Sequence, residues 1–264
     1  MNGEVQLLAD YHVHSLGHKE RTQSLNNLES FVLQAIKKGI KEIGFTDHDW
    51  VEKSPNFSLF QELQEKYPGI SIRVGIEVDH MIGREEEIYS YIKDQPFDYV
   101  MGGVHHLGEE KWMFDLPDYT DGYRGKNIDD LYIEYFKTVE HAALSDLYQI
   151  IPHLDLIKVF GYRPRKPAVS LIGNLLEIIK EKSLAIEINT NGLYKPVGEI
   201  YPAREILQKC FKLGIPITIG SDAHRYEDVG RSFNAACALA YQVGYRQIAT
   251  FRQKELIMQN LDCD

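Results

Sequence analysis

The chain of 264 residues has few cysteines, no long apolar run and fewer basic than acidic side chains. Its cysteines, Cys210, Cys237 and Cys263, lie outside any Cys-x-x-Cys motif, which predicts reduced thiols and no zinc–thiolate site. No segment approaches the ~20 apolar residues of a membrane helix. Residues 1–10 show no charged leader followed by an apolar block. We therefore expect a cytoplasmic protein with no membrane partner.

The charge and the composition narrow the class of protein further. Lys and Arg number 29 against 39 Asp and Glu, a formal charge of −10, so nucleic acid is not expected as a partner. A hydrophobic content of 44% is enough for a large core and excludes disorder as the main state. The length suits one α/β barrel, which typically takes roughly 250 residues, although two small domains would also fit.

Strand-like and helix-like segments alternate along the chain. Strands are expected at residues 5–14, 42–48, 71–79, 98–107, 150–158, 185–190 and 215–224. Helices are expected at residues 24–38, 129–148, 167–182 and 202–213, and mostly helix from Arg231 onward. Near-continuous apolar strands joined by helices predict a parallel sheet buried on both faces. We expect one α/β domain over residues 1–264, and we favour a closed barrel over an open doubly wound sheet because no Gly-x-Gly-x-x-Gly follows the first strand.

Histidines and carboxylates gather where these predicted strands end. In chain order they are His12, His14, His48, Glu77, Asp79, His105, His106, His153, Asp222 and His224. The carboxyl ends of barrel strands converge on one face, so these side chains would meet in one pocket. Residues two apart on a strand face the same side, which pairs His12 with His14 and Asp222 with His224. A single strand-end histidine is usually an ordinary hydrogen-bonded residue, but this many predict a metal site for zinc, iron or manganese.

Six short motifs follow one another in the order DYHVHS, GFTDHD, GIEVD, GGVHH, PHLDLIK and IGSDAH. Together with GLYKPVGEIYPAREIL at residues 192–207, they resemble the polymerase-and-histidinol-phosphatase (PHP) superfamily, and most of all its histidinol-phosphate phosphatase branch. The resemblance covers about residues 8–230. It implies a distorted (β/α)7 barrel that holds three divalent ions at the C-terminal ends of its strands.

The resemblance also implies which side chains bind each ion. Carried over motif by motif, the ligands are His12, His14, Glu77 and Asp222 for the first ion, Glu77, His105 and His153 for the second, and His18, His48 and His224 for the third. Glu77 would bridge the first two ions.

The expected chemistry is attack of water on a phosphate ester. A hydroxide that bridges two ions is the expected nucleophile, because a metal ion can bring the pKa of water to near 7. Asp222 would orient this hydroxide, and His224 or His18 would protonate the leaving alkoxide.

Several side chains are candidates for binding the substrate. Arg163 is the first, because its guanidinium can hold a phosphate bidentately and stabilise the phosphoryl charge. Lys195, Arg204 and His106 are further candidates, with ordinary surface solvation as the alternative for each cation. The segment 108–127 is expected to be an active-site loop. His80 and His141 lie outside the motifs and are expected to be surface histidines.

The favoured function is hydrolysis of L-histidinol phosphate to L-histidinol and phosphate, in histidine biosynthesis. One alternative is a related phosphoesterase that acts on a nucleotide, a sugar phosphate or phosphotyrosine. Another is a PHP module without activity, which the complete ligand set and the acidic charge disfavour. The identity of the metals and the oligomeric state stay open.

Overall fold

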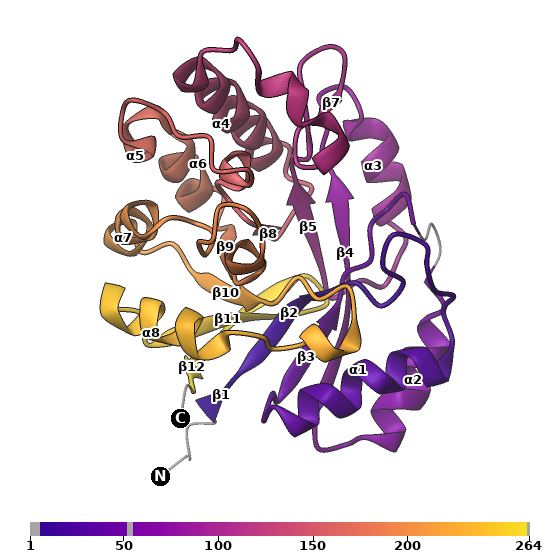
Figure 1. Cartoon of the computed structure of the whole chain (residues 1–264). Helices are drawn as coiled ribbons and strands as arrows, with labels where there is room; N and C mark the ends of the chain where they lie inside the picture. Colours follow the sequence, from indigo (N-terminus) through magenta and orange to yellow (C-terminus); the bar gives the residue numbers. More distant parts are fainter. Residues whose placement is uncertain (1–5, 52–54, 263–264) are drawn as a thin grey trace.

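The computed structural model describes residues 6–51 and 55–262, and at its centre lies a parallel sheet that curves into a barrel (Figure 1). In spatial order its strands are β10 (Ile217–Gly220), β9 (Ala185–Asn189), β8 (Ile150–Ile151), β5 (Tyr99–Gly103), β4 (Ser71–Asp79), β3 (Glu42–Phe45) and β2 (Ala9–Val13). All neighbouring pairs in this order are parallel. The chain beyond β10 meets β2, because the His14 N–H donates to the Ala223 carbonyl at 2.8 Å. The seven strands therefore nearly close, which confirms the predicted distorted barrel.

Helices surround the outside of this sheet (Figure 1). They are α1 (Leu25–Lys37), α2 (Phe57–Lys66), α3 (Glu85–Ile92), α4 (Ile128–Leu144), α5 (Ala168–Leu171), α6 (Leu175–Glu181), α7 (Arg204–Leu213) and α8 (Phe233–Val243). The predicted first helix is confirmed in α1, where the Ser24 side chain accepts a hydrogen bond from the Asn27 N–H. Leu28, Phe31 and Ala35 recur at helical spacing on its buried face.

Short helical turns and a small hairpin complete the loops at the carboxyl ends of the strands. They are the 3₁₀ helices η1 (Pro117–Tyr123), η2 (Leu156–Lys158), η3 (Asn191–Tyr194) and η4 (Tyr226–Asp228), and the paired strands β6 (His106–Leu107) and β7 (Trp112–Met113). The expected strand at residues 150–158 is mostly such a loop, because β8 has only two residues and η2 follows.

Tyr99 shows how the barrel interior is filled. Its ring lies against Gly44 and Gly75 of the neighbouring strands, where an added Cβ would come within 1.9 Å and 2.6 Å of Tyr99 atoms. Its hydroxyl donates to the Tyr11 carbonyl at 2.8 Å. Large side chains opposite glycines give the dense packing that a barrel of short strands needs.

The prediction of a mostly helical C-terminus is wrong. After α8 the chain forms an antiparallel pair, β11 (Gln247–Arg252) and β12 (Glu255–Leu261), and β1 (Gln6–Leu7) pairs in parallel with β12. The Phe251 N–H donates to the Tyr11 hydroxyl at 2.8 Å, and the Lys254 N–H donates to the Asp98 carbonyl just before β5. This hairpin therefore packs near the amino ends of the barrel strands, away from the histidines.

The expectation for the cysteines is also corrected in part. Cys210 is free and buried, whereas Cys237 is disulfide-bonded, because a pairing depends on distances in the fold that sequence spacing does not reveal. Val5, at the start of the first expected strand, and Cys263 lie outside the described residues. Over residues 6–51 and 55–262, no helix has both the length and the apolar character required to span a membrane.

Candidate metal centre

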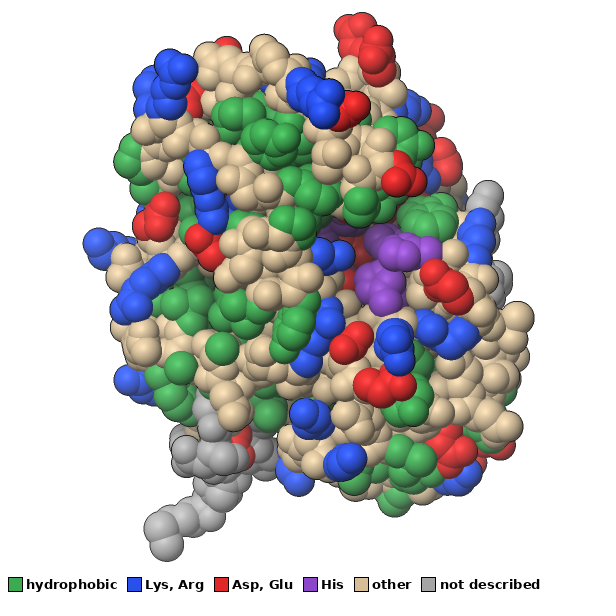
Figure 2. Space-filling model, viewed as in Figure 1, with side chains coloured by type: hydrophobic (Ala, Val, Ile, Leu, Met, Phe, Trp, Pro, Cys, Tyr) green, Lys and Arg blue, Asp and Glu red, His purple; other side chains and the backbone are tan. Residues whose placement is uncertain are grey.

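Histidine side chains line a hollow on one face of the molecule (Figure 2). This hollow is a cavity of about 530 Å³ at the carboxyl ends of the barrel strands, with seven of the predicted ligands in its wall: His18, His48, Glu77, His105, His153, Asp222 and His224. The prediction that residues remote in sequence meet at one face of the barrel is confirmed for these seven.

Glu77, close to the end of β4, lies at the centre of this cluster. Its carboxylate oxygens are 2.8–3.6 Å from ring nitrogens of five histidines, namely His12, His14, His48, His105 and His153. Burial alone would raise the pKa of Glu77, but the surrounding imidazoles outweigh burial and hold that pKa well below its usual range. Glu77 is therefore an anion placed to bind cations from both of its oxygens.

Asp222 reaches the cluster by a route that the sequence did not predict. It follows β10 with a backbone φ of +52°, so it and His224 lie in a loop and the argument from strand alternation is wrong for this pair. An aspartate tolerates this left-handed conformation better than most side chains do. The turn brings Asp222 Oδ1 to 3.3 Å from His14 Nε2 and to 3.5 Å from His224 Nδ1.

His18, His48 and His224 form the outer part of the cluster. His18 Nε2 lies 3.1 Å from His224 Nε2, and the ring centroids of His14 and His224 are 4.3 Å apart. The Trp50 indole stacks on the His18 ring with an interplanar angle of 7°. Burial lowers the pKa of His224 to about 4, despite the opposing charge of Asp222, so its imidazole is neutral near pH 7.

Three acidic or amide side chains position the predicted ligands. Glu187 Oε1 lies 2.8 Å from His12 Nδ1, which leaves His12 Nε2 facing Glu77. The Asn191 side chain donates to Asp222 Oδ2 at 2.9 Å. Asp79 Oδ1 lies 2.9 Å from His105 Nδ1 and 3.2 Å from His48 Nδ1.

Sequence reasoning gave these three residues too little weight. Asp79 was placed at a strand end but not among the predicted ligands, yet it groups with His48 and His105 as a potential ligand itself. Glu187 was not among the predicted site residues, although the spacing of two puts it on the same face of β9 as Asn189. No pattern in the sequence indicated Asn191.

The donor atoms fit divalent metal ions. Both ring nitrogens of His14 are buried and have no hydrogen-bond partner, and the same holds for His153 Nδ1. Buried polar atoms without a partner are rare, and an unoccupied imidazole lone pair is a metal ligand. Among the described residues four groups at this cavity can each surround an ion: His12, His14 and Asp222; His12, Glu77 and His153; His48, Asp79 and His105; and His14, His48 and His224.

Family models match most of the chain. A PHP domain model matches residues 10–191, and a PHP-associated model matches residues 204–236. The chain belongs to the PHP family.

Relatives place this PHP protein within the family. It is 33% identical to a probable histidinol-phosphatase of Deinococcus radiodurans over 94% of this chain and 98% of the relative. It is 29% identical to a histidinol-phosphatase of Lactococcus lactis over 92% of this chain and 93% of that one. A Lactococcus lactis histidinol phosphate phosphatase, solved with zinc, L-histidinol and phosphate, superposes with a TM-score of 0.78 at 25% identity, over 94% of this chain and 98% of that chain. The predicted branch of the PHP family is thus confirmed.

Two of the cations expected to bind phosphate do not lie in the cavity wall of this PHP protein. The Arg163 guanidinium donates to Glu199 Oε1 at 2.6 Å, and Arg204 donates to the Gln242 side chain at 2.9 Å. Each cation thus pairs with a group far from it in sequence, and the structure does not bring either to the site. Lys195 does line the cavity, and so does His106, whose Nδ1 is 3.8 Å from Asp79 Oδ2.

The expected loop 108–127 does border the site. Its residues Met113, Asp115, Leu116 and Pro117 line the cavity. Burial raises the pKa of Asp115, with the His105 charge opposing that effect. The loop therefore contributes an acidic side chain to a wall that is otherwise apolar on this side.

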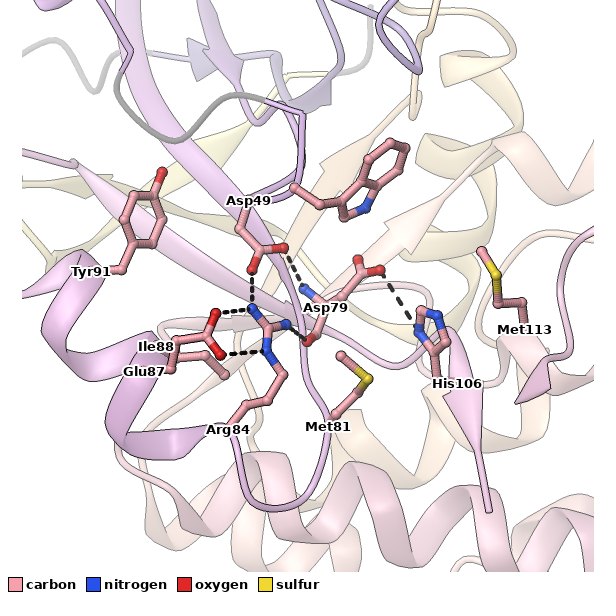
Figure 3. Close-up of a pocket in the computed structure, with 10 residues that line it drawn as sticks. Asp49, Asp79, Met81, Arg84, Glu87, Ile88, Tyr91, His106 and Met113 are labelled. Atoms are coloured by element: carbon pink, nitrogen blue, oxygen red, sulfur yellow. Dashed lines mark hydrogen bonds and ion pairs between the residues drawn. The ribbon is translucent and has the colours of Figure 1, made fainter. Parts of the chain in front are cut away.

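A second cavity of about 580 Å³ adjoins the first and shares Trp50, Asp79, His106 and Met113 with it. Figure 3 shows Arg84 in this cavity, enclosed by acidic partners. Its guanidinium contacts Asp49 at 2.9 Å, Glu87 at 3.0 Å and the Asp79 carbonyl at 2.8 Å. Because these groups neutralise Arg84, we do not assign it to phosphate.

Proposed function

We propose that this PHP protein hydrolyses L-histidinol phosphate to L-histidinol and phosphate, as a metal-dependent phosphatase of histidine biosynthesis in the cytoplasm. The observation that carries the proposal is the buried cluster of imidazoles and carboxylates around Glu77, open to a cavity of about 530 Å³. Relatives with this name match nearly the whole chain, and the Lactococcus lactis enzyme was solved with L-histidinol and phosphate.

We infer that the cluster holds three divalent ions, of zinc, iron or manganese. The proposed ligands are the nine that the family resemblance implies, with Asp79 as an addition next to His48 and His105. Divalent ions bound there supply Lewis acidity to the attacking water and to the phosphoryl oxygens.

The chain's own groups prepare this site. Glu187 orients His12, and Asn191 orients Asp222 toward His14. Lys195 is the cavity-lining lysine available to the phosphate dianion. We assign His224 as a ligand and not as the proton donor, because its low pKa leaves no proton to give near pH 7.

The proposal is tested by the rate of phosphate release from L-histidinol phosphate, compared with a nucleotide, a sugar phosphate and phosphotyrosine. We expect kcat/KM for L-histidinol phosphate to exceed that for each of the others by about a hundredfold or more, because a site built for one polar substrate leaves groups unpaired with another. A higher kcat/KM for any of the other esters would show that L-histidinol phosphate is not the preferred substrate. No release from any ester by metal-loaded protein would favour the module without activity.

Asp115 gives a sharper test of the substrate. L-histidinol phosphate carries a protonated amine, and Asp115 is a carboxylate in the cavity wall. We expect Asp115→Asn to raise KM for L-histidinol phosphate about tenfold and to change kcat less, because a charged hydrogen bond contributes about 1.5–3 kcal/mol. Kinetics on p-nitrophenyl phosphate, which has no amine, serve as the control and should stay within about twofold of wild type. An equal loss of kcat/KM on both esters would show that Asp115 does not recognise the amine of the substrate.

A further inference from the structure

A second group of histidines lies outside the catalytic cavity. His80 follows Asp79 at the end of β4, and its side chain points away from the cavity because neighbouring residues of an extended chain face opposite sides. The expectation of a surface residue is wrong for His80, whose exposed fraction is 0%. His141, on the last turns of α4, and Glu85, in the first turn of α3, lie next to it.

The distances in this group suit one small ion. His80 Nε2 lies 3.1 Å from His141 Nδ1, and His141 Nδ1 lies 3.4 Å from Glu85 Oε1. Ligands at the usual zinc bond lengths of about 2.0–2.1 Å, arranged as a tetrahedron, are roughly 3.3 Å from one another. Two of the three distances therefore match the spacing of ligands around one zinc ion, and all three donor atoms lie within 4.8 Å of one another.

The surroundings prepare His80 to act as a ligand. Its Nδ1 lies 2.9 Å from the Tyr148 hydroxyl, which leaves Nε2 directed at His141 and Glu85. A partner for the second nitrogen is the usual device that orients a metal-binding histidine.

Glu85 is held toward the two histidines, and one side of the group is open to solvent. The Gly83 N–H donates to both Glu85 oxygens, at 3.1 and 3.0 Å, and so holds the carboxylate toward the histidines. The adjacent cation, Arg84, is paired with Asp49 and Glu87. The side chains of His141 and Glu85 are 42% and 33% exposed, which leaves a route for an ion from solvent.

We propose that His80, Glu85 and His141 bind a Zn²⁺ ion at a site separate from the catalytic cluster. Two imidazoles and one carboxylate, with water as the fourth ligand, form a common zinc coordination set. The ion would tie the start of α3 to the end of α4 and stabilise the loop that leaves β4. This site does not depend on the proposed substrate.

The test counts zinc ions per chain. The test compares wild type with His141→Ala and with the control Lys137→Ala, which changes an exposed residue on α4. Each protein is equilibrated with zinc at a low micromolar concentration, and the bound ions are counted by mass spectrometry. We expect His141→Ala to bind one ion fewer than the other two proteins while its phosphatase rate stays within about twofold of wild type. Because His141 is partly exposed, its replacement should leave the fold intact, which circular dichroism checks.

Two further measurements decide the outcome. Glu85→Gln should weaken the binding of that last ion about tenfold or more, because it removes the negative ligand. Diffraction at the zinc edge should place a peak between the three side chains. Equal zinc counts in wild type and His141→Ala, or a loss of activity together with the ion, would overturn the proposal. An equal count would leave the phosphatase assignment intact, because it concerns only ions outside the catalytic cavity.

Discussion

Replacing Glu77 by glutamine is expected to lower kcat/KM by about four orders of magnitude. Two carboxylate oxygens here face five imidazoles at 2.8–3.6 Å, so Glu77 links ligands from four other segments of the barrel face. Glutamine has the same shape but no charge, and one of its two terminal atoms is a donor that would oppose a metal ion. The measurement is the rate of phosphate release together with the number of ions bound per chain.

The matched control is Glu62→Gln on the exposed side of α2, which removes the same charge far from the cluster. It should keep the wild-type rate and ion count. If Glu77→Gln kept both its full set of ions and its activity, Glu77 would not be a bridging ligand and the proposed arrangement would have to be abandoned.

The place of Glu77 could be predicted from the sequence because it depends on regular structure. The strand expected at residues 71–79 is β4, residue for residue. Once a strand is predicted to belong to a parallel barrel, the polar side chains at its carboxyl end are expected to lie at the active-site face. His12 and His105 are placed in the same way, each at or just after a strand that the apolar pattern indicated.

The features that sequence reasoning missed depend on contacts between distant segments. Arg163 has the right chemistry for phosphate, but Glu199, in the segment before α7, pairs with it. Asp222 reaches the cluster through a left-handed turn held by Asn191, which lies 31 positions earlier. Local periodicity does not indicate that Glu199 pairs with Arg163 or that Asn191 holds Asp222. The partner of a charged side chain and the path of a turn are therefore predicted less well than a strand.

The C-terminal hairpin was missed for a related reason. The alternation in β11 is weak, because residues 248–251 are all buried. A short apolar run of this kind cannot be told from a buried helix by period alone. Tyr11 and Phe251, which join the hairpin to the barrel, become partners only in the folded chain.

Removal of the metal ions is expected to abolish activity and to leave the barrel folded. The core of tyrosine, phenylalanine and aliphatic side chains does not pass through the histidine cluster, so far-UV circular dichroism should not change after chelation. An ion whose free concentration is about a hundredfold its Kd adds about 2.7 kcal/mol to the free energy of unfolding. For a chain of this size its loss corresponds to a fall in Tm of roughly 5–10 °C.

Reloading the stripped protein with zinc, iron or manganese in separate experiments should restore phosphate release and show which ion the donor set prefers, since imidazole and carboxylate ligands accept all three. Restoration should weaken as the pH falls toward 5, because protons compete with cations for the imidazole nitrogens. The competition is strongest at His12 and His105, because neighbouring carboxylates outweigh burial and raise the pKa of both imidazoles, to about 10 for His105. A stripped protein that kept more than about a thousandth of the original rate would show that water is activated without the ions, contrary to the role assigned to this cluster.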